Sequence, residues 1–93
     1  MTKVVLSGHI LVSAEDLNAV REALPIHTEL TRAEPGCLVF RVEEDPKQIG
    51  KFEVYEEFDS RESFQKHQER VRESDWGTVS KNAERFYSVD EVG

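Results

Sequence analysis

Three side chains in this sequence have the types and the placement needed for acid–base chemistry: His27, Glu56 and His67. At 100° per residue, each histidine falls on the apolar side of an expected helix, with His67 between Phe64 and Val71. Strand alternation places Glu56 among the apolar residues of an expected strand. All three side chains are therefore expected to point into the space between helices and a sheet.

In that space, an imidazole that titrates near neutral pH and is oriented by a carboxylate could transfer protons. We therefore predict His67, Glu56 and His27 as the catalytic residues. The same three groups could instead only satisfy one another's hydrogen bonds, since a buried carboxylate needs a partner or must be neutral. A metal held by them is less favoured, because ligands from three separate elements form no local signature, and we expect no metal.

Aromatic side chains could form the walls of such a pocket and favour a flat organic substrate. Packing in an ordinary core explains them equally well. His9 falls on the opposite face of its strand from Leu6 and Ile10 and is expected at an interface or on the surface. The predicted substrate-binding residues are Phe52, Phe64, Trp76 and Phe86.

The elements that must position these residues follow from periodicity and from turn and cap signals. Ser13 with Asp16 predicts a variant capping box, and Pro25 predicts a kink or break in the first helix. Asp59 or Ser60 is the expected cap of the second long helix. The expected order is a strand over 3–13, a helix over 14–34, strands over 37–43 and 51–58, a helix ending near 73, a turn with a short helix over 74–82, and a strand over 85–91.

This order predicts one α+β domain over residues 1–93 with a ferredoxin-like βαββαβ fold, in which both long helices cover one face of a four-stranded antiparallel sheet. The opposite face would then leave an apolar patch in water. A second copy of the chain is the simplest cover, so we expect a homodimer. The residues expected on that face are Val5, Leu11, Val39, Tyr55, Tyr87 and Val89.

Composition excludes several other classes of protein. The formal net charge is −7 over 93 residues, with basic residues scattered among acids, which argues against nucleic acid and anionic membranes as partners. No apolar run is long enough to span a membrane, and no leader signature follows Met1, so we expect a cytoplasmic protein. The single cysteine, Cys37, is expected to be a small buried hydrophobe.

Three segments in order resemble the antibiotic biosynthesis monooxygenase family, which includes quinol monooxygenase-like proteins. They are an EPGC turn at 34–37, a YExF strand end at 55–58 and an FxxH helix at 64–67. The resemblance covers nearly the whole chain. It implies a dimeric α+β barrel, and His67 and Glu56 match recurrent family positions, whereas His27 rests on helix geometry.

The resemblance further implies oxygenation of a phenolic, quinol-like or polyketide aromatic substrate by O2, without flavin, haem or metal as cofactor. Relatives that degrade haem have an asparagine on the first strand, where this chain has Ser7 and His9. Two alternatives stay open: an isomerase that uses the same histidine–glutamate pair, and a non-catalytic dimer that binds a small molecule.

Overall fold

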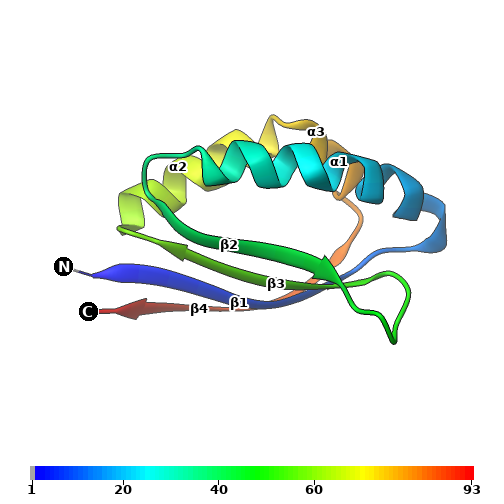
Figure 1. Cartoon of the computed structure of the whole chain (residues 1–93), viewed down its shortest axis with the longest axis horizontal. Helices are drawn as coiled ribbons and strands as arrows, with labels where there is room; N and C mark the ends of the chain where they lie inside the picture. Colours follow the sequence, from blue (N-terminus) through cyan, green and yellow to red (C-terminus); the bar gives the residue numbers. More distant parts are fainter. Residues whose placement is uncertain (1) are drawn as a thin grey trace.

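A four-stranded antiparallel sheet carries three helices on one face in the computed structural model, which describes residues 2–93 (Figure 1). The strand order is β2-β3-β1-β4, which confirms the predicted ferredoxin-like α+β fold. None of the helices in this part of the chain is long and apolar enough to cross a membrane. The elements are β1 (Lys3–Leu11), α1 (Ala14–Arg32), β2 (Cys37–Glu44), β3 (Lys51–Phe58), α2 (Arg61–Arg72), α3 (Asp75–Val79) and β4 (Glu84–Val92).

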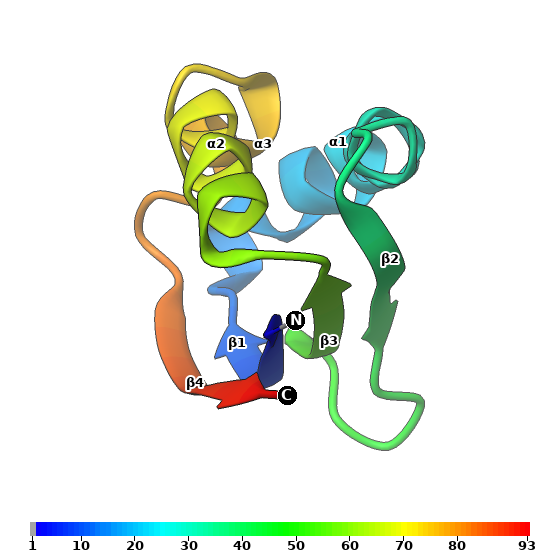
Figure 2. The same ribbon diagram turned by 90° about the vertical axis from the view of Figure 1, so that its left-hand side faces the viewer.

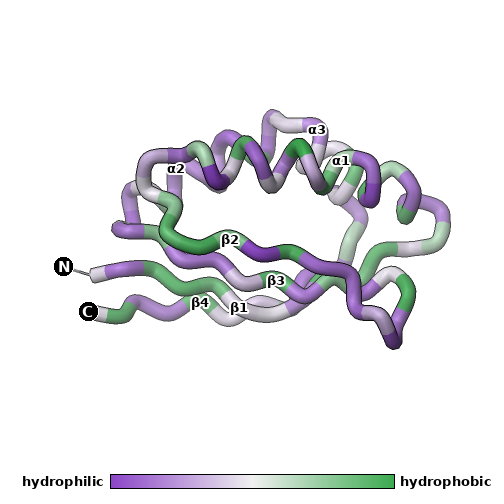
Figure 3. The backbone as a smooth tube through the Cα atoms, in the orientation of Figure 1, coloured by the Kyte–Doolittle hydropathy of each residue, from purple (hydrophilic) through white to green (hydrophobic). Residues whose placement is uncertain are grey.

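The helices lie side by side above the sheet, with α1 on the side of β2 and with α2 and α3 on the side of β4 (Figure 2). Hydrophilic and hydrophobic stretches alternate along α1, as expected of a helix with one face on a core (Figure 3). The strands supply the other half of this core. Its buried members are Leu6, Ile10, Val12, Leu17, Val20, Phe40, Val42, Phe52, Val54 and Trp76.

Helix α1 departs from the sequence-based expectations in two details. It continues unbroken through Pro25, so the predicted break is wrong. Pro25 is exposed, and water can therefore satisfy the carbonyl that lacks a helical donor. Ser13 is the N-cap residue as predicted, but its hydroxyl donates to Asp16 Oδ2 at 3.4 Å and not to the backbone, so the predicted capping box lacks its side-chain bond to an amide.

The apolar side of α1 is narrower than its residue types suggest. Ile26 and Leu30, both expected on that side, are 60% and 49% exposed. The buried positions instead include His27 and Thr31, so a polar group occupies the centre of the buried face. Ile26 and Leu30 lie at the space between the helices and not in the core.

A β-bulge at the start of β2 changes the expected alternation. Cys37 pairs with Phe58 and Val39 pairs with Glu57, which leaves Leu38 as the extra residue. Leu38 is 54% exposed although simple alternation placed it on the same face as Phe40. One inserted residue is enough to turn a side chain away from the core.

Helices α2 and α3 each begin at a serine whose side chain caps the first turn. The Ser63 amide donates to Ser60 Oγ at 3.1 Å, which confirms the predicted cap of α2. Ser74 caps α3 in the same way, through the Gly77 amide. A Cβ at Gly77 would lie 2.1 Å from the Val71 carbonyl oxygen, so only glycine lets α3 approach α2 this closely.

The register of β4 reverses the faces that we expected for its aromatic residues. Val89 pairs with buried Leu6 and Tyr87 pairs with Gly8, so both side chains belong to the face under the helices. Phe86 pairs with His9 on the opposite face, and the two rings stack with centroids 4.9 Å apart. The strand has two partly apolar faces, and only the pairing with β1 decides between them.

The outer face of the sheet, opposite the helices, combines apolar and charged groups. Val5 and Val39 are half-buried there, as expected. Lys3 pairs with Glu57 at 2.8 Å, and the Tyr55 hydroxyl also donates to Glu57. The apolar patch on this face is therefore smaller than the sequence suggested.

Gly8→Ala tests the close contact between β1 and β4. Gly8 has φ of 149°, and an added Cβ would lie 1.9 Å from the Phe86 carbonyl oxygen. We expect the free energy of unfolding to fall by about 2 kcal/mol or more, from backbone strain plus displacement of β4. Urea unfolding measures the change. Ser7→Ala on the same strand is the control, and equal stability of the two variants would contradict the contact.

Candidate active site

A cavity of about 220 Å³ lies between the sheet and the helices and is called the inner chamber here. All three predicted catalytic residues line it, and they come from three different elements: His27 from α1, Glu56 from β3 and His67 from α2. The side chains of Leu6, Gln68, Val71, Trp76, Arg85 and Tyr87 complete its wall. The sequence thus predicted which titratable groups meet.

His67 lies between two carboxylates. Its Nδ1 is 2.9 Å from Glu34 Oε1, and its Nε2 is 3.5 Å from Glu56 Oε1. The ring also packs on Phe58, with centroids 4.8 Å apart. Because 3.5 Å exceeds a good hydrogen-bond length, Nε2 and Glu56 face each other without a strong bond between them.

Glu34 was missed as a site residue, because the sequence around it indicates only a turn. Its Oε2 accepts a 2.7 Å hydrogen bond from Arg70 Nε, and Arg70 Nη2 donates to Thr31 Oγ1 at 2.9 Å. The spacing did carry a signal, since His27, Thr31 and Glu34 stand at i, i+4 and i+7 and therefore share one side of a helix.

His27 is neutral and stacked. Its ring is parallel to Trp76 within 2°, with centroids 4.7 Å apart. Burial, together with the nearby His67 and Arg70, lowers its pKa to about 3. Its Nδ1 is buried without a hydrogen-bond partner. This arrangement makes His27 a poor base at neutral pH and leaves one ring nitrogen available to a ligand.

Glu56 and His67 have ionisation properties suited to proton exchange. Burial raises the pKa of Glu56 to about 7, with a further contribution from the charge of Glu34. Burial lowers the pKa of His67, and Glu34 opposes that shift. Near pH 7 the imidazole is therefore mainly neutral and the Glu56 carboxyl is about half protonated.

Tyr87, and not Phe86, supplies the aromatic wall on β4. It lines the inner chamber beside Glu56, while Phe86 stacks on His9 across the sheet. Burial and the charge of Glu56 raise the pKa of Tyr87 to about 12, so its hydroxyl keeps its proton. The prediction of Phe86 as a pocket residue fails on strand register.

The other predicted substrate-binding residues divide between core and cavity. Phe52 is 1% exposed and belongs to the core, and Phe64 packs against Phe58 with centroids 5.6 Å apart. Neither lines the inner chamber. Trp76 does, and its place in the stack with His27 makes it the predicted aromatic residue nearest to the catalytic candidates.

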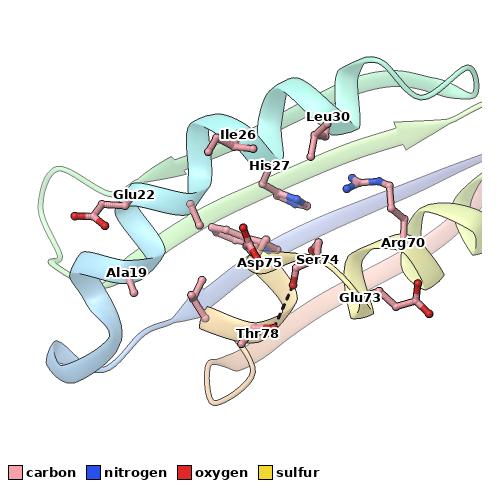
Figure 4. Close-up of a pocket in the computed structure, with 13 residues that line it drawn as sticks. Ala19, Glu22, Ile26, His27, Leu30, Arg70, Glu73, Ser74, Asp75 and Thr78 are labelled. Atoms are coloured by element: carbon pink, nitrogen blue, oxygen red, sulfur yellow. Dashed lines mark hydrogen bonds between the residues drawn. The ribbon is translucent and has the colours of Figure 1, made fainter.

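A larger groove of about 580 Å³ runs between α1 and the pair α2 and α3 (Figure 4). His27 and Trp76 line both the groove and the inner chamber, so the stack of these two rings separates the cavities. Ile26 and Leu30 border the groove from α1, and Arg70 borders it from α2 (Figure 4). The volume and the largely apolar walls are typical of small-molecule sites.

The histidine and carboxylate side chains of the site are not arranged as metal ligands. Over residues 2–93, no group of three or more histidine, cysteine, aspartate and glutamate side chains is arranged to hold a metal ion. His27 meets Trp76 and Phe40 instead of converging with His67 and Glu56 on one point. The inner chamber therefore offers proton-transfer groups within a wall of mixed polar and apolar side chains.

Comparison with known proteins identifies the family of this chain. Residues 4–72 match the family model described as antibiotic biosynthesis monooxygenase. The chain belongs to this family. The matched segment includes Glu34, Glu56 and His67 and ends before α3 and β4, so Trp76 and Tyr87 lie outside it.

Solved structures show the antibiotic biosynthesis monooxygenase fold along the whole chain. A candidate antibiotic biosynthesis monooxygenase from Nitrosomonas europaea is similar with a TM-score of 0.75 at 19% identity, covering 100% of this chain and 97% of the other. One from Deinococcus radiodurans gives 0.72 at 24% identity, with coverage of 100% and 93%. A candidate oxidoreductase from Bacteroides thetaiotaomicron gives 0.77 at 18% identity, with 98% of both chains covered. A search of curated proteins gives no match.

Glu56→Gln tests the ionisation of the buried carboxyl. The folded-state pKa of Glu56 is about 7, above the usual 4.5, so folding takes up a proton between these pH values. The contribution of Glu56 to the free energy of unfolding should therefore fall as pH rises from about 4.5 to 7, by on the order of 3 kcal/mol.

Urea titrations across this range should show the free energy of unfolding rising more steeply with pH in Glu56→Gln than in the wild type, because the variant lacks the Glu56 contribution. His27 acts with the opposite sign, since its lowered pKa makes stability rise with pH between about 3 and 6.5. The difference between the two proteins isolates Glu56. Parallel profiles would contradict a raised pKa.

Proposed function

We propose that the protein is a cofactor-independent monooxygenase that oxidises a phenolic, quinol-like or polyketide aromatic substrate with O2. The observation that carries the proposal is the buried pair of His67 Nε2 and Glu56 Oε1, 3.5 Å apart at the wall of the inner chamber. One member is a neutral base and the other holds a proton about half of the time near pH 7. Family membership supports the same reaction class.

The first step is removal of a proton from the substrate by His67. Nε2 is the only polar atom of this ring on the chamber side, because Nδ1 is bonded to Glu34. A substrate hydroxyl, or a CH₂ group made acidic by flanking carbonyls, gives its proton to Nε2 and becomes an electron-rich anion. The anion is stabilised beside the imidazolium that forms.

The second step joins the substrate to oxygen. The anion carbon donates an electron pair to O2, a carbon–oxygen bond forms, and O2 is reduced to the peroxide level. The peroxide takes up a proton, for which Glu56 is the donor nearest to His67. Loss of water with the second hydrogen of the carbon then gives a carbonyl, so that CH₂ and O2 become C=O and H2O.

The remaining wall groups bind the substrate and exclude water. The stack of His27 and Trp76 presents a flat aromatic surface to both cavities, and the groove takes ring systems larger than a chamber of about 220 Å³ holds. The unpartnered His27 Nδ1 is a hydrogen-bonding position for a substrate oxygen. A dry site protects the peroxide from side reactions.

His67→Ala should lower turnover about 10²-fold or more, the size expected when a general base is lost. Glu56→Gln should have a smaller effect, because His67 still removes the first proton and the imidazolium that it forms can return a proton to the peroxide. An oxygen electrode with a panel of quinols and anthrones measures both. His9→Ala removes a histidine from the outer face and is the matched control. Full activity of His67→Ala on a genuine substrate would contradict the mechanism.

The two alternatives differ in their dependence on oxygen. An isomerase that uses the same pair would turn over without oxygen. A binding module would raise its melting temperature with the ligand and convert nothing. Turnover that stops under anaerobic conditions and returns with air therefore separates oxygenation from both.

We also propose that the chain works as a homodimer joined through the outer face of the sheet. Phe86 is 47% exposed there, and half-buried Val5 and Val39 lie on the same face. Light scattering should give twice the chain mass of 10.7 kDa. Phe86→Glu should give the monomer mass, because it places a charge in the joined face.

Ile49→Glu is the control for this variant. Ile49 is 79% exposed in the loop between β2 and β3, so the same change of chemistry is placed away from the face. A wild-type protein with the mass of one chain would contradict the dimer.

A further inference from the structure

Glu34 holds His67 from the side opposite the inner chamber. Both of its carboxylate oxygens lie within hydrogen-bond distance of His67 Nδ1, at 2.9 and 3.2 Å. Its Oε2 also accepts from Arg70 Nε at 2.7 Å. Glu34 itself does not line the chamber, so it can act on a substrate only through His67.

We propose that Glu34 is a positioning residue that fixes His67 in one tautomer, with the hydrogen on Nδ1 and the lone pair on Nε2. This inference rests on the proposed role of His67 as the base. It assigns the direction of proton flow: the imidazole accepts at Nε2, and Glu56 is the group that donates.

The tautomer follows from hydrogen-bond chemistry. A carboxylate only accepts, so the nitrogen that it touches must carry the hydrogen. In a neutral imidazole the other nitrogen then has the lone pair. In His67 that nitrogen is Nε2, which faces Glu56. A carboxylate behind a histidine acts in the same way in the hydrolase triads.

Arg70 and Thr31 hold the Glu34 side chain in its orientation. The Arg70 guanidinium contacts Glu34 through Nε and Thr31 Oγ1 through Nη2, at 2.7 and 2.9 Å. Two donors of one guanidinium thus hold both the carboxylate and the threonine, which leaves Glu34 Oε1 directed at His67 Nδ1. Thr31 is fully buried, which fixes the position of the arginine against α1.

The charged and titratable groups around His67 come from every element packed on it. Glu34 follows α1, Glu56 is on β3 and Arg70 is on α2. The His27 ring from α1 lies with its centroid 6.1 Å from that of His67. Of these groups, Glu34 alone bonds Nδ1, so the position of the hydrogen on His67 is set by this one contact.

Glu34→Gln should reverse the tautomer without changing the shape of the side chain. Arg70 Nε is a donor and therefore takes the amide oxygen. The amide NH₂ is then directed at Nδ1, which must accept, and the hydrogen moves to Nε2. The imidazole would present a donor to Glu56 and to the substrate, and it could no longer remove a proton.

Nitrogen-15 NMR of the histidine rings reads the tautomer without any substrate. We expect the wild type near pH 7 to show Nδ1 protonated and Nε2 unprotonated in His67, and Glu34→Gln to show the opposite. Glu29→Gln, an exposed carboxylate on α1, is the matched control and should match the wild type. Arg70→Gln should keep the wild-type tautomer, because the Glu34 carboxylate is still present.

The kinetic result should follow the spectrum. We expect Glu34→Gln to lower kcat on the order of 10²-fold or more with little change in KM, since the wrong tautomer is present in the bound complex. Its melting temperature should stay close to that of Glu29→Gln. A purely structural role would instead lower the melting temperature and leave the tautomer as it is.

Failure of this inference and failure of the proposed function are distinguishable. An Nε2-protonated His67 in the wild type, or an unchanged tautomer in Glu34→Gln, overturns the role of Glu34 whatever the activity. The expected tautomers without oxygen uptake on the quinol and anthrone panel support Glu34 and count against the monooxygenase.

Discussion

The carboxylate of Glu34, shared between His67 and Arg70, joins the end of α1 to the middle of α2 above the sheet. The alignment of the two long helices and the orientation of the buried imidazole depend on this contact. A polar group placed there has to be satisfied, because an unpaired one at this depth destabilises the fold. The same hydrogen bonds therefore serve stability and chemistry, and the buried side-chain atoms of residues 2–93 left without a hydrogen-bond partner are His27 Nδ1 and Glu56 Oε1.

The fold and the central pair were predictable from the sequence because both depend on local periodicity. A helix period placed His67 on a buried face, and strand alternation placed Glu56 opposite it. The cap at Ser60 was predictable for the same reason, since a serine before a helix bonds an amide only three residues away. Such features need no knowledge of which strand lies beside which.

The remaining features depend on contacts between distant segments. The pairing of β4 with β1 decides whether Tyr87 or Phe86 lies on the face under the helices. Alternation along β4 shows only that the two side chains lie on opposite faces. Leu38 is turned outward by a single bulge. Glu34 and Arg70 form a hydrogen bond although they are 36 positions apart in the sequence. The residues around each of them are typical of a solvent-exposed segment. Charged residues that pair between helices resemble surface residues until their partners are known.

The stack of His27 on Trp76 gives the protein an intrinsic optical probe. The chain has one tryptophan, and its indole forms part of the wall between the groove and the inner chamber. The fluorescence of an indole responds to the polarity of its surroundings and to a charged or electron-poor ring placed against it. Tryptophan emission therefore comes from this one place, and a quinone-like molecule that enters either cavity would quench it without any attached dye.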